Sequence, residues 1–248
     1  LVGIGASTLM SVRLGQKDYE TANKVLGNVF VLNIILGLAF SVVTLAFLDP
    51  ILMFFGASAE TLPYAREYMT VILAGNVITH MYLGLNALLR SSGNPKKAMY
   101  ATIFAVIINL ILNPLFIFTF KMGIKGSALA TIISQILMLA WQISIFSNKK
   151  NFVHLKKGVF RLKRKIVLDS MAIGLSPFFI NAASSLLVII INQSLSKYGG
   201  DLSVGAYGIV NRVVFLFGMV VMGFNQGMQP IAGYNYGALQ FKRVDEVF

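Results

Sequence analysis

The stretch "AMYATIFAVIINLILNPLFIFTF", residues 98–120, decides the fold class. It runs for 23 residues without a charge, and a helix that rises about 1.5 Å per residue needs about 20 apolar residues to cross a bilayer. Two amides lie inside it, Asn109 and Asn113, four residues apart and therefore on one helix face. Pro114 follows at once and removes a backbone N–H. The stretch predicts a transmembrane helix that bends where it is polar.

The whole chain has the composition of a membrane protein. It is 56% hydrophobic and 12% charged, with a mean hydropathy of +0.75, which is too apolar for a soluble domain of this length. Residues 202–211 extend the last helix outward past Arg212, and residues 1–12 resemble the end of another helix. We therefore expect an all-α polytopic transmembrane bundle with one partial span and six complete ones. The uncharged runs that predict the complete spans are 25–48, 68–89, 98–120, 126–148, 170–196 and 213–241.

The first residues suggest a piece of a longer protein. Leu1 lies in an apolar segment that has no initiator Met, charged n-region or cleavage site, so a signal peptide is not expected. Cysteine is absent, which excludes a disulfide or a thiolate metal site within these residues.

The net charge of +12 is distributed as in a membrane protein. Sixteen of the 21 Lys and Arg residues fall in four alternate loops, which is the positive-inside pattern and a poor match to nucleic-acid binding. The pattern predicts a multi-pass protein of the plasma (inner) membrane. The loops expected in the cytoplasm are 13–24, 90–97, 149–168 and 238–246.

The longest of these loops, residues 149–168, is expected to join two helical bundles. Its apolar residues follow a three-and-four spacing that predicts an amphipathic helix at the membrane surface, attracted to anionic lipid. The expected organisation is residues 1–148 as most of an N-terminal six-helix lobe, 149–168 as a basic cytoplasmic linker, and 169–248 as the start of a second lobe. The apolar residues concerned are Phe152, Leu155, Val159, Leu162 and Ile166.

An internal repeat supports two lobes. Residues 5–25 and 227–247 align at an offset of 222 with three identities, Gly5/Gly227, Gly15/Gly237 and Val25/Val247. Both stretches end an apolar helix with Gly and enter a cytoplasmic loop in the same orientation, as parallel repeats of a transporter do.

The acidic residues argue against an enzyme. All nine lie in loops or at helix ends, so no catalytic carboxylate pair or metal site is expected at mid-membrane. Only His80 lies at depth, where either packing or a proton relay could explain it.

Amides are abundant within the spans and predict a polar central path, although each alone could simply join helices. Arg212 either lines that path or extends outward to the membrane surface. Three prolines are candidates for helix bends, Pro114, Pro177 and Pro230. Further candidates for the path are His80, Gln135, Asn192, Arg212, Gln226 and Gln229.

Three stretches together, residues 86–99, 109–135 and 227–238 ("GMQPIAGYNYGA"), resemble the multidrug and toxic compound extrusion (MATE) family of efflux transporters. The resemblance covers nearly the whole chain. It implies two six-helix lobes around a V-shaped cavity, with this chain running from the end of helix 2 to helix 8. It also implies export of drug-like, amphipathic cations in exchange for H⁺ or Na⁺, by alternating access and without another cofactor.

The resemblance further implies a cation-responsive polar cluster at Asn86, Asn109, Asn113 and Thr131. Asn113 stands where the family usually has an Asp, and an amide cannot carry a proton at physiological pH. Coupling would then rest on a first-helix residue, on acids of the second lobe, or on Na⁺ bound by neutral oxygens. The alternative is that this cation site no longer works.

We therefore expect a multidrug antiporter that is not an enzyme and acts as a monomer in the bilayer. A lipid-linked oligosaccharide flippase of the same superfamily is the nearest alternative, although it should carry more cations in its cavity than Arg212 alone. A channel or receptor would need a gating domain. A membrane enzyme would need catalytic residues outside these 248.

Overall fold

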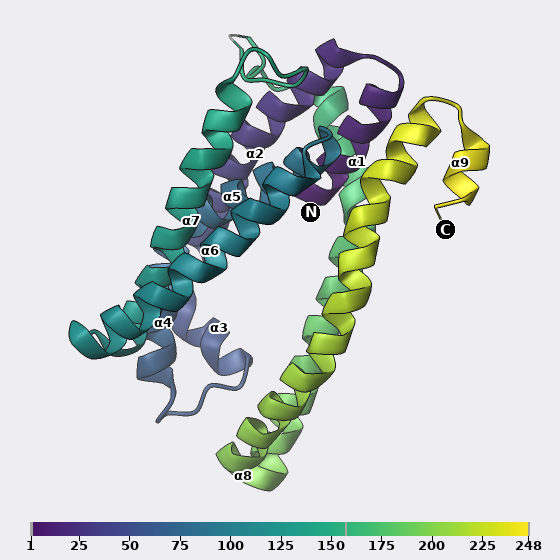
Figure 1. The fold of residues 1–248 in the computed structure, drawn as a ribbon. Coiled ribbons are helices and arrows are strands. Elements are labelled where there is room, and N and C mark those ends of the chain that lie inside the picture. The colour runs from purple at the N-terminus through teal and green to yellow at the C-terminus, as the bar shows by residue number, and fades with distance from the viewer. Residues whose placement is uncertain (1, 157, 248) are drawn as a thin grey trace.

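The computed structural model describes residues 2–156 and 158–247, and every regular element in these residues is helical (Figure 1). This confirms the predicted all-α fold class. The elements are α1 (Val2–Gly15), α2 (Tyr19–Ala46), α3 (Leu48–Phe54), α4 (Leu62–Ala74), α5 (Asn76–Ser91), α6 (Pro95–Pro114), the π-helix η1 (Leu115–Thr119), α7 (Gly123–Ser147), α8 (Arg164–Gly237) and α9 (Phe241–Asp245).

The predicted spans are confirmed in number and order. Five helices in the described residues are long and apolar enough to cross a membrane, and the bent pair α4–α5 makes a sixth. The long α8 is a hairpin of two such helices, residues 164–200 and 202–237, which meet at Gly200. Gly200 has φ +66° and ψ −174°, a conformation open to glycine alone, and it reverses the chain.

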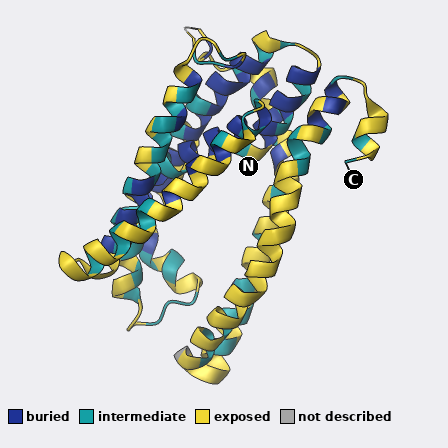
Figure 2. Ribbon diagram, in the orientation of Figure 1, coloured by how far each residue is buried: buried dark blue, intermediate teal, exposed yellow. Residues whose placement is uncertain are grey.

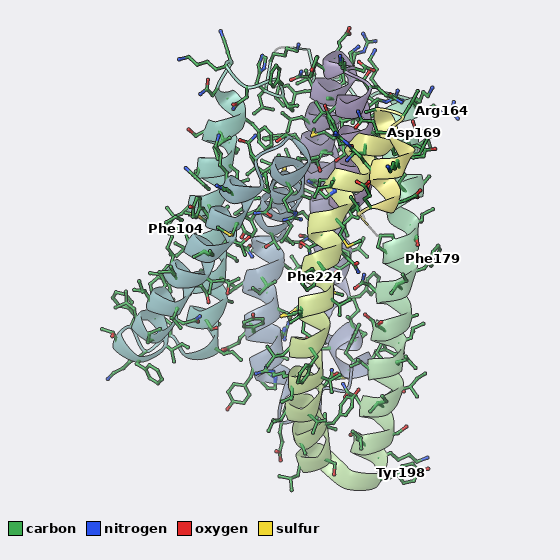
Figure 3. All side chains as sticks on the ribbon, turned by 45° about the vertical axis from the view of Figure 1, so that its right-hand side comes forward. Phe104, Arg164, Asp169, Phe179, Tyr198 and Phe224 are labelled. Carbon is green, nitrogen blue, oxygen red and sulfur yellow. The ribbon has the colours of Figure 1, made fainter. Side chains whose placement is uncertain are left out.

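Buried residues gather where α1, α2 and α5 pack together, whereas most of α8 is exposed (Figure 2). Leu26, Leu85 and Leu88 are fully buried in this core. Large apolar side chains cover the outside of α6 and both halves of α8, as Phe104, Phe179 and Phe224 illustrate (Figure 3). Such a surface suits hydrocarbon rather than water.

The helices are close together at one end of the bundle and diverge toward the other. α8 packs mainly on α1, and its second half draws away from α6 and α7 (Figure 1). The close end carries the loops that are predicted to be cytoplasmic. The open end carries the α3–α4 and η1–α7 connections.

The span expected at 68–89 is present but broken, because the helix bends by 58° at Gly75, between α4 and α5. Two contacts from α2 stabilise the break. Ser41 Oγ donates to the Leu73 carbonyl at 2.8 Å, and Asn76 Nδ2 donates to the Gly37 carbonyl at 3.1 Å. The Leu73 carbonyl beside the break is thus satisfied within the protein, as a membrane requires.

The expected amphipathic helix over 149–168 is wrong. The described residues between Asn148 and Lys163 form turns and bends, and α8 begins only at Arg164. Val153 and Val159 are nevertheless buried. We call residues 148–163 the linker.

The two copies of the repeat end in the same conformation. Lys17 and Leu239, 222 residues apart, both adopt the left-handed region, with φ of 59° and 58°. They follow Gly15 and Gly237, which end α1 and α8. The closing backbone hydrogen bonds repeat at the same offset: Gln16–Val12 and Ala238–Tyr234 at 3.0 Å, and Asp18–Arg13 and Gln240–Asn235 at 2.9 Å.

Candidate functional site

Asn109, Asn113 and Thr131, three of the four residues assigned to the polar cluster, form one hydrogen-bonded chain across α6 and α7. Asn113 Nδ2 donates to Asn109 Oδ1 at 2.7 Å, and Asn109 Nδ2 donates to Thr131 Oγ1 at 3.1 Å. Thr131 Oγ1 in turn donates to the Ser127 carbonyl at 3.1 Å. The three hydrogen bonds thus run in one direction, from Asn113 through Asn109 to Thr131. We call these three side chains the relay.

The relay leaves one acceptor free. Asn113 Oδ1 is buried and has no hydrogen-bond partner in the described residues, while the amide nitrogen of the same side chain donates to Asn109. A buried carbonyl oxygen without a donor costs about 1–3 kcal/mol. It is therefore poised to accept an N–H donor or to contact a cation.

The end of α6 holds this oxygen in place. Pro114 closes the α-helix, and the chain continues as the π-helix η1, in which Phe120 N–H donates to the Leu115 carbonyl at 3.0 Å. A π-turn next to a proline relaxes the disrupted hydrogen-bond ladder, and such turns are common at functional sites. By contrast, the helical backbone of α8 continues through Pro177 and Pro230, and Gly200 is its single non-helical residue.

Asn86, the fourth cluster residue, lies in a separate group. It is buried and donates to the Ala98 carbonyl at 2.9 Å and to Thr102 Oγ1 at 3.3 Å. Its Oδ1 accepts a hydrogen bond from Arg90 Nη1. Asn86 thus joins α5 to the first turns of α6 and fixes Arg90, and it makes no hydrogen bond to Asn109.

The secondary candidates are spread over several contacts. Gln135 Oε1 accepts a hydrogen bond from Thr79 Oγ1 at 2.6 Å, which joins α7 to α5 beside the exposed His80. Gln229 Nε2 donates to Thr8 Oγ1 and therefore joins α8 to α1. Asn192 and Arg212 make no side-chain hydrogen bond to the described residues, and Arg212 is exposed.

A cavity of about 770 Å³ lies at the close end, between α5 and the second half of α8. Arg90 is the only charged residue among those that line it. Gln226 also lines the cavity, together with Tyr19, Phe152, Tyr234 and Asn235. The cavity is mostly apolar with a few polar groups, which suits amphipathic molecules.

Sequence reasoning missed two buried amides on α2 that bind the linker. Asn23 accepts from His154 N–H at 2.8 Å and donates to the Phe152 carbonyl at 3.2 Å. Asn28 binds a later part of the linker in the same way: it accepts from Lys163 N–H at 2.7 Å and donates to the Arg161 carbonyl at 3.2 Å. Their position at the loop end of an apolar helix was the available signal.

Close packing reinforces this attachment. A Cβ on Gly27 would lie 2.2 Å from the Val159 carbonyl oxygen, so only glycine allows the linker to approach α2 so closely there. Tyr19 stacks on Phe152, with ring centroids 5.4 Å apart.

Comparison with known proteins finds a matching family model and several similar proteins. The model of the MatE family matches residues 1–115 and 167–248. The multidrug export protein MepA of Staphylococcus aureus (strain NCTC 8325 / PS 47) is 29% identical over 247 residues, which cover 100% of this chain and 54% of MepA. MepA of Staphylococcus haemolyticus (strain JCSC1435) is 28% identical over 247 residues, which again cover 100% of this chain and 54% of that protein.

Solved structures agree with these matches. The MATE multidrug transporter DinF-BH in complex with rhodamine 6G superposes with a TM-score of 0.90 and 34% identity, over 99% of this chain and 55% of that one. An outward-facing MATE family transporter of the MOP superfamily superposes with a TM-score of 0.89 and 26% identity, again over 99% of this chain and 55% of that one. The chain thus spans about half the length of the relatives it matches.

Proposed function

Because this chain belongs to the MatE family, whose members are multi-pass membrane transporters rather than enzymes, we propose that the full-length protein exports drug-like organic cations. Export would proceed by alternating access between two lobes, in exchange for H⁺ or Na⁺. The relatives that carry the name multidrug export protein support the cargo class.

The free oxygen of Asn113 is the observation that carries this proposal. Three aligned donors orient the relay so that its open end is an acceptor, and a buried acceptor attracts ammonium groups and small cations. Because the free oxygen belongs to an amide, it can bind Na⁺ but cannot take up a proton at physiological pH. We therefore propose Na⁺ as the ion that acts at Asn113.

Dye transport by the full-length protein in everted vesicles tests the proposal, with rhodamine 6G as the probe. A pH gradient alone and a Na⁺ gradient alone are imposed on the native protein, on Asn113→Asp and on Asn113→Leu. We expect transport driven by Na⁺ in the native protein, added drive by H⁺ in the Asp variant, and loss of transport in the Leu variant at normal expression.

Three other results would contradict parts of this proposal. Equal H⁺ drive in the native and Asp forms would move ion coupling away from Asn113. Unaltered efflux in the Leu form would make the relay a packing contact. No dye movement under either gradient would favour the flippase alternative.

A further inference from the structure

The cavity of about 770 Å³ at the close end of the bundle has no part in the proposed function. The relay residues do not line it, and Arg90 is the one charged side chain among the described residues that do. Its size falls within the roughly 300–1,000 Å³ of ligand pockets. A drug-like cation would meet only a like charge here, which disfavours the proposed cargo as the ligand of this cavity.

Arg90 is held in a fixed position without a counter-charge from the described residues. Its Nη1 donates to Asn86 Oδ1, and Asn86 is itself tied to the Ala98 carbonyl at 2.9 Å. None of the ion pairs among the described residues includes Arg90, although its side chain is partly buried. A guanidinium has several N–H donors, and one neutral amide oxygen uses few of them. An anion that reaches the remaining donors would therefore stabilise this partly buried cation.

Apolar groups make up much of the remaining lining. Phe152 of the linker and Ile231 of α8 both line the cavity and are 77% and 53% exposed. Leu14 and Pro230 add further apolar surface. Tyr19 stacks on Phe152, with ring centroids 5.4 Å apart, and extends this wall. A ligand that satisfies both parts of the lining combines an anionic group with an apolar chain.

The cavity also lies at the depth expected for lipid headgroups. Its lining includes Ser92 and Pro95 from the turn between α5 and α6, which belongs to the predicted cytoplasmic loop 90–97. Tyr19 and Tyr234 line it as well, and tyrosines gather at the headgroup level of membrane proteins. The predicted cytoplasmic loops carry 16 of the 21 Lys and Arg residues, and basic segments of this kind attract anionic lipid to the protein.

We infer that this cavity binds an anionic phospholipid of the cytoplasmic leaflet. The remaining donors of Arg90 hold the phosphate, because a guanidinium matches two phosphate oxygens with paired N–H groups. An acyl chain lies against Phe152 and Ile231. The lining comes from α1, α5 and the linker together with the second half of α8, so the lipid contacts both sides of the close end and stabilises the folded protein.

Thermal unfolding of the purified full-length protein in detergent micelles tests the inference. The lipid probes are dioleoylphosphatidylglycerol, which is anionic, and dioleoylphosphatidylcholine, which has no net charge. The shift of the unfolding midpoint with lipid concentration gives an apparent affinity for each. We expect the native protein to bind phosphatidylglycerol about tenfold more tightly than phosphatidylcholine. Glycerol 3-phosphate and inorganic phosphate, added as soluble probes at the same concentrations, should leave the midpoint unchanged.

Three variants locate the binding. Arg90→Gln should remove the preference for phosphatidylglycerol. Lys96→Gln is the matched control and should keep the preference, because it removes one exposed positive charge from the same loop but outside the cavity lining. Ile231→Ser leaves α5 and Arg90 unaltered, so it tests the site even if the Arg90 variant is unstable. It should weaken binding of phosphatidylglycerol about threefold through lost apolar contact.

The contrary outcomes are distinct. A preference that survives Arg90→Gln, or that Lys96→Gln lowers equally, would overturn the site in favour of a general attraction to the basic loops. Unchanged lipid binding by Ile231→Ser would overturn the acyl-chain contact. A midpoint shift with either soluble phosphate as large as that with the lipid would overturn the lipid as the ligand. The assay contains no cargo, so this inference does not rest on the proposed function, and either can fail without the other.

Discussion

The backbone N–H of Lys163 donates to Asn28 Oδ1 at 2.7 Å, one residue before α8 begins. Because Asn23 and Asn28 hold the linker backbone in the same manner, the linker is part of the first bundle rather than a loose tether. The attachment to α2 therefore extends along the linker to the residue before α8.

Loss of the Asn28 amide should release the linker. Asn28→Ala removes two part-buried hydrogen bonds to the linker backbone, which we expect to cost about 1–3 kcal/mol of unfolding free energy. Trypsin should then cleave the linker faster, and gel analysis of digests in everted vesicles measures this. Asn181→Ala is the control, since that exposed amide bonds only to its own helix at Pro177. Equal cleavage of the two variants would show that the linker is held by other contacts.

The relay predicts that Thr131 acts through its hydroxyl. Thr131→Val keeps the shape but removes the acceptor of Asn109 Nδ2, so the amides lose their fixed orientation. Thr131→Ser keeps the hydroxyl. We expect Val to reduce efflux of rhodamine 6G about tenfold and Ser to retain most of it. If both variants transport alike, the orientation of the relay does not matter for export.

Gln142 should be replaceable with a gain in stability. It is fully buried in α7, and neither its Nε2 nor its Oε1 has a partner in the described residues. Gln142→Met keeps the volume and removes the unpaired polar atoms, so thermal unfolding in detergent should show a stabilisation of about 1 kcal/mol. Gln135→Met should destabilise instead, because it breaks the 2.6 Å contact with Thr79. A loss of stability in the Gln142 variant would indicate a buried water.

Asp18 links stability to pH. Hydrogen bonds from the Thr21 side chain and backbone N–H, followed by the charges of Arg13 and Lys24, hold the pKa of the Asp18 carboxyl below its ordinary value. A lowered pKa in the folded state contributes stability above the unfolded pKa of about 3.9, and this contribution is lost as pH falls through the folded value.

Asp18→Asn keeps a good helix N-cap without the charge. The native protein should therefore exceed this variant in melting temperature by a small margin at pH 7. The margin should shrink as the pH falls below about 3.9 and vanish once the pH is below the lowered pKa of the folded state. Asp18→Ala should lose about 1 kcal/mol at both pH values, because the cap itself is gone. A margin that does not change with pH would assign no role to the Asp18 charge.

The membrane topology can be tested with single cysteines. Ser92→Cys, in the turn between α5 and α6, should react with an impermeant thiol reagent from the cytoplasmic side only. Glu60→Cys, between α3 and α4, should react from the outside only. The reverse pattern would invert the assignment of the close end to the cytoplasm.

The spans could be predicted from the sequence because hydropathy along one segment decides each of them. The break at Gly75 could not, since Gly75 lies in an apolar run and its stabilising partners, Ser41 and Gly37, are more than thirty residues away. The linker has a helical spacing of apolar residues, yet the amides of α2 compete successfully for its backbone. Long-range hydrogen bonds of this kind leave no periodic signal.

The candidate site, like the fold, could be predicted from the sequence only in part. The spacing of Asn109 and Asn113 placed them on one face of α6, and they are in contact. Thr131 lies on another helix, and only the family resemblance pointed to it. Asn86 was grouped with them by resemblance, but the tight turn through Gly93 brings Ala98 within its reach instead.

The repeat also bears on the origin of the chain, because its two copies meet where α1 crosses the second half of α8. A contact in which residues 12 and 15 of one repeat meet residues 237 and 234 of the other is isologous, as in a homodimer. A half-length ancestor that paired with itself would have met its own copy through the same two positions. After duplication and fusion, a mutation at Gly15 alters one side of the contact alone. The two copies of the repeat differ in most of their side chains, while the backbone contacts at their meeting point are symmetric.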